Sequence, residues 1–271
     1  MKRSERRAVR TLVASLGYHD VTDTPAESGF QRDGAVAYKL GSAQFAHQLD
    51  WITAGRLAPS LVTDIDLTRP GRHLLLTFDD GGKSALTISE ELSRRGWRGH
   101  FFITTSLIGR RTFLSREEIR EIRRLGHVVG SHSHSHPDIC RELTWEQMVV
   151  EWRKSSDILA QLLGEPCCTG AVPGGEISDS VLRSAGAAGL RYVFTSEPTL
   201  QPRAIGGCWV LGRFCVKRST TPADIARLIK FQGWPRKLLI RKLKTVASRS
   251  LPFLYRLYVS RSTQGWLEPV Q

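Results

Sequence analysis

Short apolar runs alternate with amphipathic segments along most of the chain, and this alternation predicts its fold. We expect strands at residues 73–78, 100–104, 127–131, 168–172, 192–195 and 209–216, and helices at residues 84–95, 115–125, 144–163, 178–185 and 223–230. Capping-box sequences at Ser115 and Thr144 mark the starts of two of these helices. Strands that alternate with helices at least five times indicate parallel strands joined by helical crossovers. The chain is therefore predicted to be an α/β protein, with a (β/α) barrel, closed or incomplete, as its architecture.

Three polar clusters follow predicted strands at the point where each strand ends. Asp79 and Asp80 follow the first strand, His132 and His136 follow the third, and Pro173–Gly175 follow the fourth. In a (β/α) barrel the carboxyl ends of the strands share one face, and this face carries the functional residues. We therefore expect the three clusters to form a single site.

The first two clusters have the chemistry of a divalent-metal site. Adjacent carboxylates repel each other unless a cation or a proton compensates their charge. Asp80, His132 and His136 offer one carboxylate and two imidazoles, a set that suits zinc and its neighbouring transition metals and leaves a coordination position open. Asp79 is then a candidate general base for hydrolysis. The competing interpretations are a solvated acidic turn and a histidine-rich patch that binds metal fortuitously.

Two of these segments resemble the motifs of a known family. Residues 77–81 (TFDDG) are similar to the first motif of the polysaccharide deacetylases, the NodB-like carbohydrate esterase family four, and residues 132–137 (HSHSHP) are similar to the second. The resemblance extends over residues 35–230. It implies a distorted (β/α) barrel of about seven strands. It also implies hydrolytic removal of acetyl groups from N-acetylated sugars, or of O-acetyl groups from some polymers.

The resemblance further implies a role for each motif residue. Asp80, His132 and His136 match the metal ligands, and Asp79 matches the base that takes a proton from metal-bound water. The cation would polarise the acetyl carbonyl, and a backbone N–H at Gly174 would help to stabilise the oxyanion. Zinc is the metal expected first, with cobalt, nickel and iron as alternatives. His134 falls at a variable position of the second motif and is left out of the site.

Two departures from the family pattern affect catalysis. Residues 171–175 (AVPGG) lack the arginine and the aromatic residue of the third motif, and no histidine follows His136 to act as the general acid of the fifth. We predict that Arg213 replaces the missing cation from a neighbouring strand. Lys217 is the alternative, and both residues could instead be surface charges. The predicted substrate-binding residues are accordingly Pro173, Gly174, Gly175 and Arg213.

Two other functions compete with deacetylation. The missing general acid favours a metal-binding carbohydrate-recognition protein without turnover, whereas the retained Asp79 argues against it. A phosphoesterase or amidohydrolase could also use a His-x-His pair, but it would need further His or Asp ligands late in the chain, where none is evident. The preferred hypothesis is deacetylation of an acetylated polysaccharide or glycolipid, as in bacterial exopolysaccharide biosynthesis.

Basic residues gather at the two ends of the chain. The net charge is +13, to which residues 1–10 contribute +4 and residues 236–261 contribute +8. The part of the chain between these two segments is nearly neutral, which argues against a nucleic-acid-binding core. Residues 235–261 combine their charge with apolar residues at helical spacing, which is typical of a helix at an anionic membrane surface. Packing of this helix against the barrel and binding of an acidic glycan are the alternatives.

We predict three parts of the chain. Residues 1–34 have no assigned role, residues 35–231 form the deacetylase domain, and residues 232–271 form a basic amphipathic C-terminal helical extension. The five cysteines follow no paired pattern, and no segment has the composition of a signal peptide or a membrane span. We therefore expect a cytoplasmic protein with peripheral contact at the inner face of the membrane.

Overall fold

A sheet of nine strands forms the centre of the described structure. The computed structural model describes residues 10–175, 177–250, 253 and 259–261. The strands are β1 (Thr11–Tyr18), β2 (Gly71–Phe78), β3 (His100–Ile103), β4 (Val128–Ser131), β5 (Thr169–Ala171), β6 (Tyr192–Phe194), β7 (Arg203–Ile205), β8 (Cys208–Leu211) and β9 (Phe214–Cys215). They lie in the order β7-β8-β6-β5-β4-β3-β2-β1-β9. Every neighbouring pair in this order is parallel except β7 and β8.

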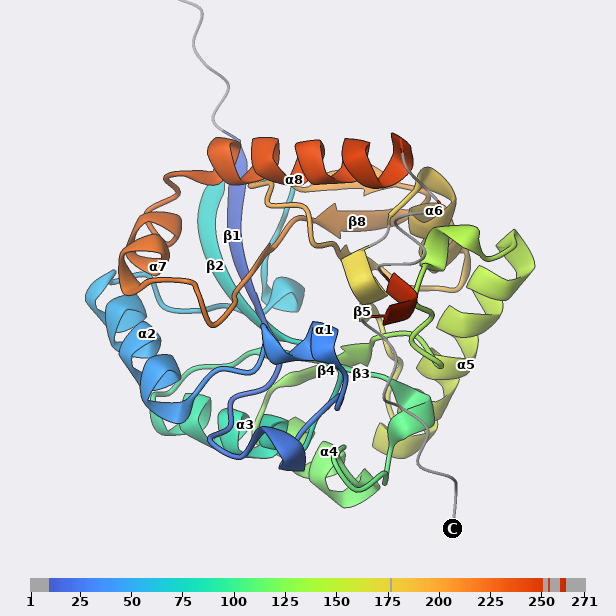
Figure 1. The fold of residues 1–271 in the computed structure, drawn as a ribbon, viewed down its shortest axis with the longest axis horizontal. Helices are drawn as coiled ribbons and strands as arrows, with labels where there is room; N and C mark the ends of the chain where they lie inside the picture. The colour runs from blue at the N-terminus through green and yellow to red at the C-terminus, as the bar shows by residue number, and fades with distance from the viewer. Residues whose placement is uncertain (1–9, 176, 251–252, 254–258, 262–271) are drawn as a thin grey trace, which may run out of the picture.

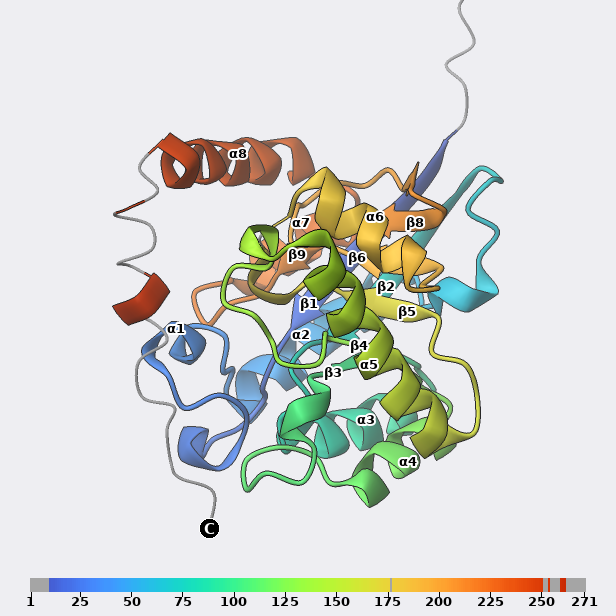
Figure 2. The same ribbon diagram turned by 90° about the vertical axis from the view of Figure 1, so that its right-hand side faces the viewer.

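Helices surround this sheet on its outer side (Figures 1 and 2). They are α2 (Ser42–Ala54), α3 (Ser84–Arg94), α4 (Arg116–Arg124), α5 (Trp145–Leu163), α6 (Asp179–Ala187) and α7 (Pro222–Leu228). The short α1 (Asp33–Val36) lies instead in front of the strands in Figure 1, and α8 (Trp234–Ser250) runs along the upper edge of the same view. The predicted α/β fold is confirmed, with helices as the crossovers between parallel strands.

Two features differ from the expected elements. Residues 11–18, which had no predicted role, form β1, and this strand pairs with both β2 and β9. They therefore belong to the sheet rather than to a separate N-terminal segment. The strand expected at residues 209–216 is divided into β8 and β9, which lie near opposite ends of the strand order. These differences, together with the short β7, raise the strand number from the six predicted ranges to nine, against the seven or so that the resemblance implies.

The break between β8 and β9 brings the two ends of the sheet together. Only Gly212 and Arg213 separate β8, which pairs with β6, from β9, which pairs with β1. So short a connection spans at most about 10 Å, so the ends of the sheet must approach each other here. Gly212 is needed at this position because a Cβ would collide with the Thr199 hydroxyl and the Glu197 carbonyl. The next side chain, Arg213, is fully buried.

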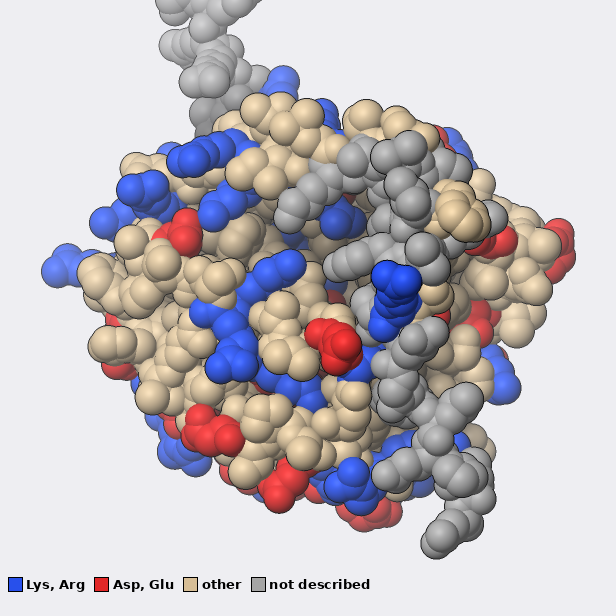
Figure 3. Space-filling view, viewed as in Figure 1, with Lys and Arg blue, Asp and Glu red and all other residues tan. Residues whose placement is uncertain are grey.

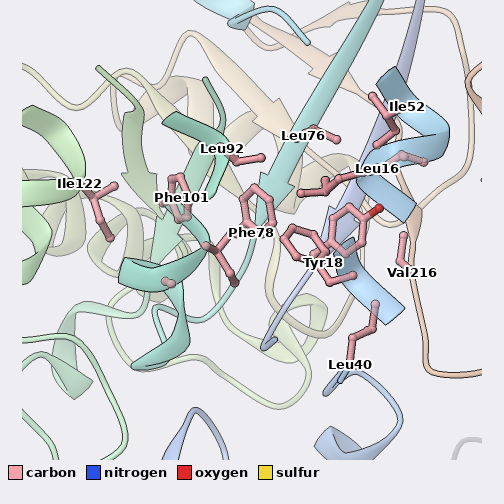
Figure 4. Packing of buried hydrophobic residues seen from close by; sticks show 14 of the residues in the cluster. Leu16, Tyr18, Leu40, Ile52, Leu76, Phe78, Leu92, Phe101, Ile122 and Val216 are labelled. Atoms are coloured by element: carbon pink, nitrogen blue, oxygen red, sulfur yellow. The ribbon is translucent and has the colours of Figure 1, made fainter. Parts of the chain in front are cut away.

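Alternate residues of each strand pack on opposite faces of the sheet. In β2, Leu74, Leu76 and Phe78 belong to a cluster that includes Leu92 of α3 and Ile122 of α4 (Figure 4). Leu75, between the first two in the sequence, belongs to a different cluster with other strand residues. Both faces of a parallel sheet are covered, so its strands are apolar throughout their length. This explains why the sequence of β2 could be recognised as a strand.

Two buried histidines are held in their neutral form by hydrogen bonds. His100 accepts the N–H of Val62 at Nε2 (2.9 Å) and donates from Nδ1 to the carbonyl of Leu76 (3.0 Å). His127 likewise accepts one backbone N–H at 3.0 Å and donates to one backbone carbonyl at 3.0 Å. A protonated imidazole has no acceptor, so charging either ring would break one of its bonds. Burial lowers the pKa of both histidines to about 4.

Lowering the pH from 7 to 5 is expected to reduce the free energy of unfolding by about 2 kcal/mol for each of these histidines. The unfolded chain binds protons at the ordinary histidine pKa, whereas the folded rings stay neutral until about pH 4. Stability is therefore lost as the pH falls through this interval. Urea unfolding at a series of pH values measures the slope, and His127→Gln should reduce it. An unchanged slope in that variant would contradict the assignment.

Candidate active site

Asp80, His132 and His136 come together beyond the carboxyl ends of β2 and β4. Oδ1 of Asp80 lies 3.3 Å from Nε2 of His132 and 3.6 Å from Nε2 of His136. The potential ligand atoms of the three residues all lie within 4.8 Å of one another. One carboxylate and two imidazoles at this spacing can converge on a single divalent cation. The structure thus assembles the three predicted ligands.

The surroundings of this cluster fit a cation. Oδ1 of Asp80 is buried and has no hydrogen-bond partner among the described residues, which is costly for a carboxylate oxygen unless a positive charge compensates it. His132 donates from Nδ1 to the carbonyl of Ala171 (2.9 Å), so its Nε2 lone pair faces Asp80. Nδ1 of His136 lies 3.3 Å from Nη2 of Arg32. A neutral ring that bound a cation through Nε2 would carry its proton on Nδ1, so this nitrogen would no longer accept a hydrogen bond from Arg32.

The loop between the two histidines is shaped by α5. Glu151 of this helix accepts two backbone N–H groups of the loop, at 2.8 and 2.9 Å. Ser133 and His136 adopt positive φ angles of 63° and 57°, which non-glycine residues rarely do and which need such support. His134 turns elsewhere, with Nδ1 3.0 Å from the Thr105 hydroxyl. Its position is consistent with its omission from the predicted ligands.

Asp79 is held by Arg213 in a buried two-point ion pair. Nη1 lies 2.6 Å from Oδ1 and Nη2 lies 2.8 Å from Oδ2. Arg213 also donates from Nε to the carbonyl of Thr195 (3.1 Å) and from Nη1 to the hydroxyl of Thr77 (3.0 Å). A guanidinium bound through all three of its nitrogens has one fixed position, and it fixes the carboxylate in turn. The predicted replacement for the third-motif arginine therefore contacts Asp79 directly.

The charges around this ion pair keep Asp79 ionised. Burial raises the pKa of the Asp79 carboxyl, but the positive charge of Arg213 and its hydrogen bonds outweigh burial and hold the pKa below its ordinary value. Burial lowers the pKa of Arg213, but the carboxylate of Asp79 outweighs it and raises the pKa overall. Burial also lowers the pKa of His136 to about 3, so this imidazole is neutral, as a metal ligand must be.

A cavity of about 360 Å³ lies over the cluster and the ion pair, a size suited to a small ligand. Gly174 and Gly175 line this cavity, whereas Pro173 is buried and is absent from its lining. Lys217 also lines it, but its Nζ lies 4.7 Å from the centre of the Tyr38 ring. Of the predicted substrate-binding residues, the structure therefore brings Gly174, Gly175 and Arg213 to the cavity.

His19 and Asp20 line the same cavity and were missed by the sequence analysis. Nδ1 of His19 is buried and has no hydrogen-bond partner in the described part of the chain. Asp20 accepts hydrogen bonds from the hydroxyls of Ser28 and Ser84, which hold it in place. Both residues directly follow β1, just as the aspartate pair directly follows β2. A polar pair after an apolar run could therefore have predicted these two residues. It was overlooked because the sequence of β1 was not recognised as a strand.

The cluster is expected to bind one divalent cation. Replacing a second-layer partner of a metal ligand typically weakens binding by roughly 10–100-fold. His132→Gln removes a ligand itself, so it should weaken binding of Zn²⁺ or Co²⁺ by more than this. His134→Gln, in the same loop, should leave the affinity unchanged. Isothermal titration calorimetry on chelator-treated protein measures both, and equal losses in the two variants would exclude the proposed ligand set.

The parallel sheet and the Asp–His–His cluster beyond its strand ends agree with the fold and the site that the resemblance to the polysaccharide deacetylases implies. Residues 66–193, a little under half of the chain, match the family model for polysaccharide deacetylase. It is 32% identical over 87 residues to the peptidoglycan-N-acetylglucosamine deacetylase PgdA of Listeria monocytogenes. The matched segment is 31% of this chain and 18% of PgdA, so the chain matches less than a fifth of that relative.

Solved structures of low sequence identity share the fold. The deacetylase PplD of Streptococcus pyogenes, in complex with acetate, superposes with a TM-score of 0.68 at 19% identity, covering 81% of this chain and 99% of PplD. IcaB from Ammonifex degensii superposes with a TM-score of 0.67 at 21% identity, covering 81% of this chain and 97% of IcaB. The NodB-like fold class is therefore confirmed over most of the chain.

Proposed function

We propose that this protein is a metal-dependent hydrolase that removes acetyl groups from N-acetylated sugars of a polysaccharide or glycolipid. The observation that carries the proposal is the Asp79–Arg213 ion pair beside the cluster of Asp80, His132 and His136. A base held in its ionised form next to a cation site is what hydrolysis of an amide by water requires. PgdA is named for the N-acetylglucosamine of peptidoglycan, which makes this sugar the first to test.

In the proposed reaction Asp79 is the general base. A divalent cation, zinc in the first instance, supplies Lewis-acid polarisation of the acetyl carbonyl and acidifies water when it is bound. The carboxylate of Asp79 accepts a proton from the attacking water, since each of its oxygens keeps a lone pair beyond the bond from Arg213. Arg213 positions this carboxylate and keeps it ionised, so the base is ready without reorganisation.

The developing oxyanion needs a hydrogen-bond donor, which we assign to the backbone N–H of Gly174. Gly174 lines the cavity and adopts a φ angle of 60°, a conformation that glycine adopts without strain. Backbone donors held rigidly in a water-poor cavity stabilise an oxyanion at little reorganisation cost. The adjacent Gly175 is fixed by a hydrogen bond from Arg241 to its carbonyl (2.6 Å), which supports the turn.

The leaving amine must gain a proton, and we assign this step to His19. This histidine lines the cavity, and its charge lowers the pKa of both Asp79 and Asp80, so it lies within electrostatic reach of both carboxyls. It follows β1, the strand that pairs with β9, so it lies close in the sheet to where the fifth motif would supply its histidine. The neighbouring Asp20 is a weaker candidate because two serine hydroxyls donate to its Oδ1 and hold it in place.

His19→Gln is expected to lower kcat by roughly 10²-fold without changing metal affinity. Glutamine keeps a polar side chain in the cavity but cannot give a proton to the amine. The measurement is the rate of acetate release at saturating substrate, with metal content determined in the same samples. His47→Gln, at an exposed histidine of α2, is the control and should leave kcat unchanged. A His19→Gln rate equal to that of the control would remove His19 from the mechanism.

A metal-binding carbohydrate-recognition protein without turnover is the second candidate. The absence of any histidine after His136 favours it, because the family's usual proton donor is missing. It predicts sugar binding at the same cavity with no release of acetate. The buried Asp79–Arg213 pair argues against this candidate, because a binding protein has no need for a carboxylate kept ionised at the cation site.

Acetate release from N-acetylglucosamine oligosaccharides, with O-acetylated polymers tested in parallel, examines the proposed function. We expect release from an N-acetylated substrate that stops after chelation and returns when zinc is added. Adding cobalt, nickel or iron to the same chelated protein compares the alternative metals. If no acetylated substrate yields acetate while the metal is bound, the deacetylase proposal fails and the recognition protein is preferred.

A further inference from the structure

Helix α8 carries an apolar stripe that faces away from the barrel. Leu239, Leu243 and Val246 are 59%, 62% and 61% exposed. Their spacing of four and then three residues places them on one side of the helix. They belong to the segment 235–261 for which membrane contact was predicted, of which residues 251–252 and 254–258 lie outside the described part of the chain.

Polar contacts hold the opposite side of α8 against the body of the protein. Nζ of Lys237 lies 2.9 Å from Asp224 of α7, and Arg241 donates to the carbonyl of Gly175 at 2.6 Å. The helix begins at the buried Trp234, whose indole N–H donates to a backbone carbonyl of α7 at 3.0 Å. A surface helix normally buries its apolar side, so α8 has the reverse orientation. Its apolar stripe therefore does not pack on the barrel.

The charged residues of α8 are all basic. Residues 234–250 contain six Lys and Arg and no Asp or Glu. Arg236 and Lys242 are exposed, and helical geometry places them on either side of the apolar stripe. Figure 3 shows more basic than acidic surface over the centre of the face on which α1 lies. None of the described helices has both the length and the hydropathy needed to cross a bilayer.

We propose that α8 docks on the anionic surface of a lipid bilayer. Leu239, Leu243 and Val246 enter the boundary between headgroups and acyl chains, while Arg236 and Lys242 meet the lipid phosphates. Charge complementarity selects this partner, because an apolar stripe flanked by cations and free of acidic residues is the pattern of interfacial helices. A second copy of α8, which contains no Asp or Glu, would offer these cations no acidic counterpart.

Docking in this orientation has a consequence for the substrate. Lys237, Ile240 and Arg241 of α8 line the cavity over the candidate metal site. A docked α8 therefore holds one wall of the cavity at the membrane surface. Acetylated sugars carried on a lipid, or polymers assembled at that surface, then reach the cavity without leaving the membrane. This consequence rests on the proposed deacetylase function, whereas the docking itself does not.

Vesicle flotation tests the docking with the full chain and no sugar present. The wild-type protein should float with vesicles of phosphatidylcholine and phosphatidylglycerol and remain unbound with phosphatidylcholine alone. Changing Leu239, Leu243 and Val246 together to serine should lower the partition coefficient by roughly tenfold or more. The pair Arg236→Gln and Lys242→Gln should lower it by roughly 30-fold, and less at high salt.

Helix α5 offers matched controls for both changes. Trp145 and Val150 are exposed apolar residues on it, and Arg153 and Lys154 are exposed cations. Serine at the first two, or glutamine at the last two, should leave vesicle binding unchanged. Equal losses in the α5 and α8 variants would overturn the proposal, as would equal binding to neutral and anionic vesicles. A wild-type dimer that the α8 serine variant converts to monomer would assign the stripe to a second copy and also overturn it.

Acetate release from a soluble oligosaccharide, measured in the same variants, separates docking from catalysis. The α8 serine variant should keep the wild-type rate on this substrate, because none of its three changed residues lines the cavity. Vesicle binding in a protein that releases no acetate would leave the docking intact and reject the deacetylase function. Acetate release by a protein that does not bind vesicles would support the deacetylase function and reject the docking.

Discussion

Replacing Asp79 by asparagine is expected to lower kcat by about 10³-fold. The asparagine side chain has the same shape and still accepts a hydrogen bond from Arg213, but it cannot take a proton from water at neutral pH. The metal ligands are unchanged, so substrate binding should be affected much less than turnover. Initial rates of acetate release over a range of oligosaccharide concentrations separate kcat from KM and check this expectation.

The controls for this variant must separate lost chemistry from lost structure. Asp79→Asn leaves Arg213 buried without a counter-ion, so urea unfolding and metal content should be measured in the same preparation. Asp138→Asn is the matched variant. Asp138 also lines the cavity and pairs with Arg32 at 3.1 Å, but its side chain is 47% exposed. Asp138→Asn should change kcat by less than a few-fold. A folded, metal-loaded Asp79→Asn enzyme with near-normal turnover would exclude Asp79 as the base.

Arg213→Met is expected to lower the free energy of unfolding by about 3–5 kcal/mol. Arg213 is fully buried, and its removal leaves the Asp79 carboxylate in the protein interior without its cation. Burial raises the pKa of Asp79, and the same change removes the Arg213 charge that lowers it. The pKa of Asp79 should therefore rise, and the acidic limb of the pH–rate profile should move to higher pH. Urea unfolding measures the first effect, and rates between pH 4 and 8 measure the second.

An exposed ion pair supplies the comparison for Arg213. Arg98 lies 2.9 Å from Asp64, with both side chains about half exposed, so Arg98→Met should cost less than about 1 kcal/mol. The double variant Asp79→Asn with Arg213→Met removes both buried charges and should recover part of the stability lost in each single variant. Equal costs for Arg213→Met and Arg98→Met, or strictly additive losses in the double variant, would contradict a coupled buried pair.

The elements that could be predicted from the sequence are those whose residues are buried on both faces of the sheet. The apolar run of β2 indicated a strand because helices and the interior both cover it. In β1 the same pattern is interrupted by Ser15 and Gly17, so its run of apolar residues is too short to be recognised. The edge strand β7 is largely exposed, so it carries no apolar signal at all.

Local patterns located the metal cluster, whereas Arg213 was predicted only as a replacement for the cation that the resemblance implies, and His19 was missed. Asp80 and His132 directly follow recognisable strands, so strand positions bring them together, and the loop that Glu151 supports adds His136. Arg213 meets Asp79 across 134 residues, and this contact depends on the approach of the two sheet ends at Gly212. No pattern of neighbouring residues in the sequence predicts that the two ends of the sheet approach each other. The amphipathic spacing of α8 was likewise visible, but the side that faces the barrel is decided by its contacts with α7 and with the turn at Gly175.

The central claim is that Asp79 and the Asp–His–His cluster form one hydrolytic centre, and a crystal structure with Co²⁺ and acetate tests it most directly. Anomalous scattering locates the cobalt independently of any interpretation of the side chains. We predict cobalt within about 2.2 Å of Asp80, His132 and His136, with an acetate oxygen beside it and Asp79 still paired to Arg213. Cobalt bound elsewhere, or an Asp79 carboxylate that points away from the acetate, would contradict the claim.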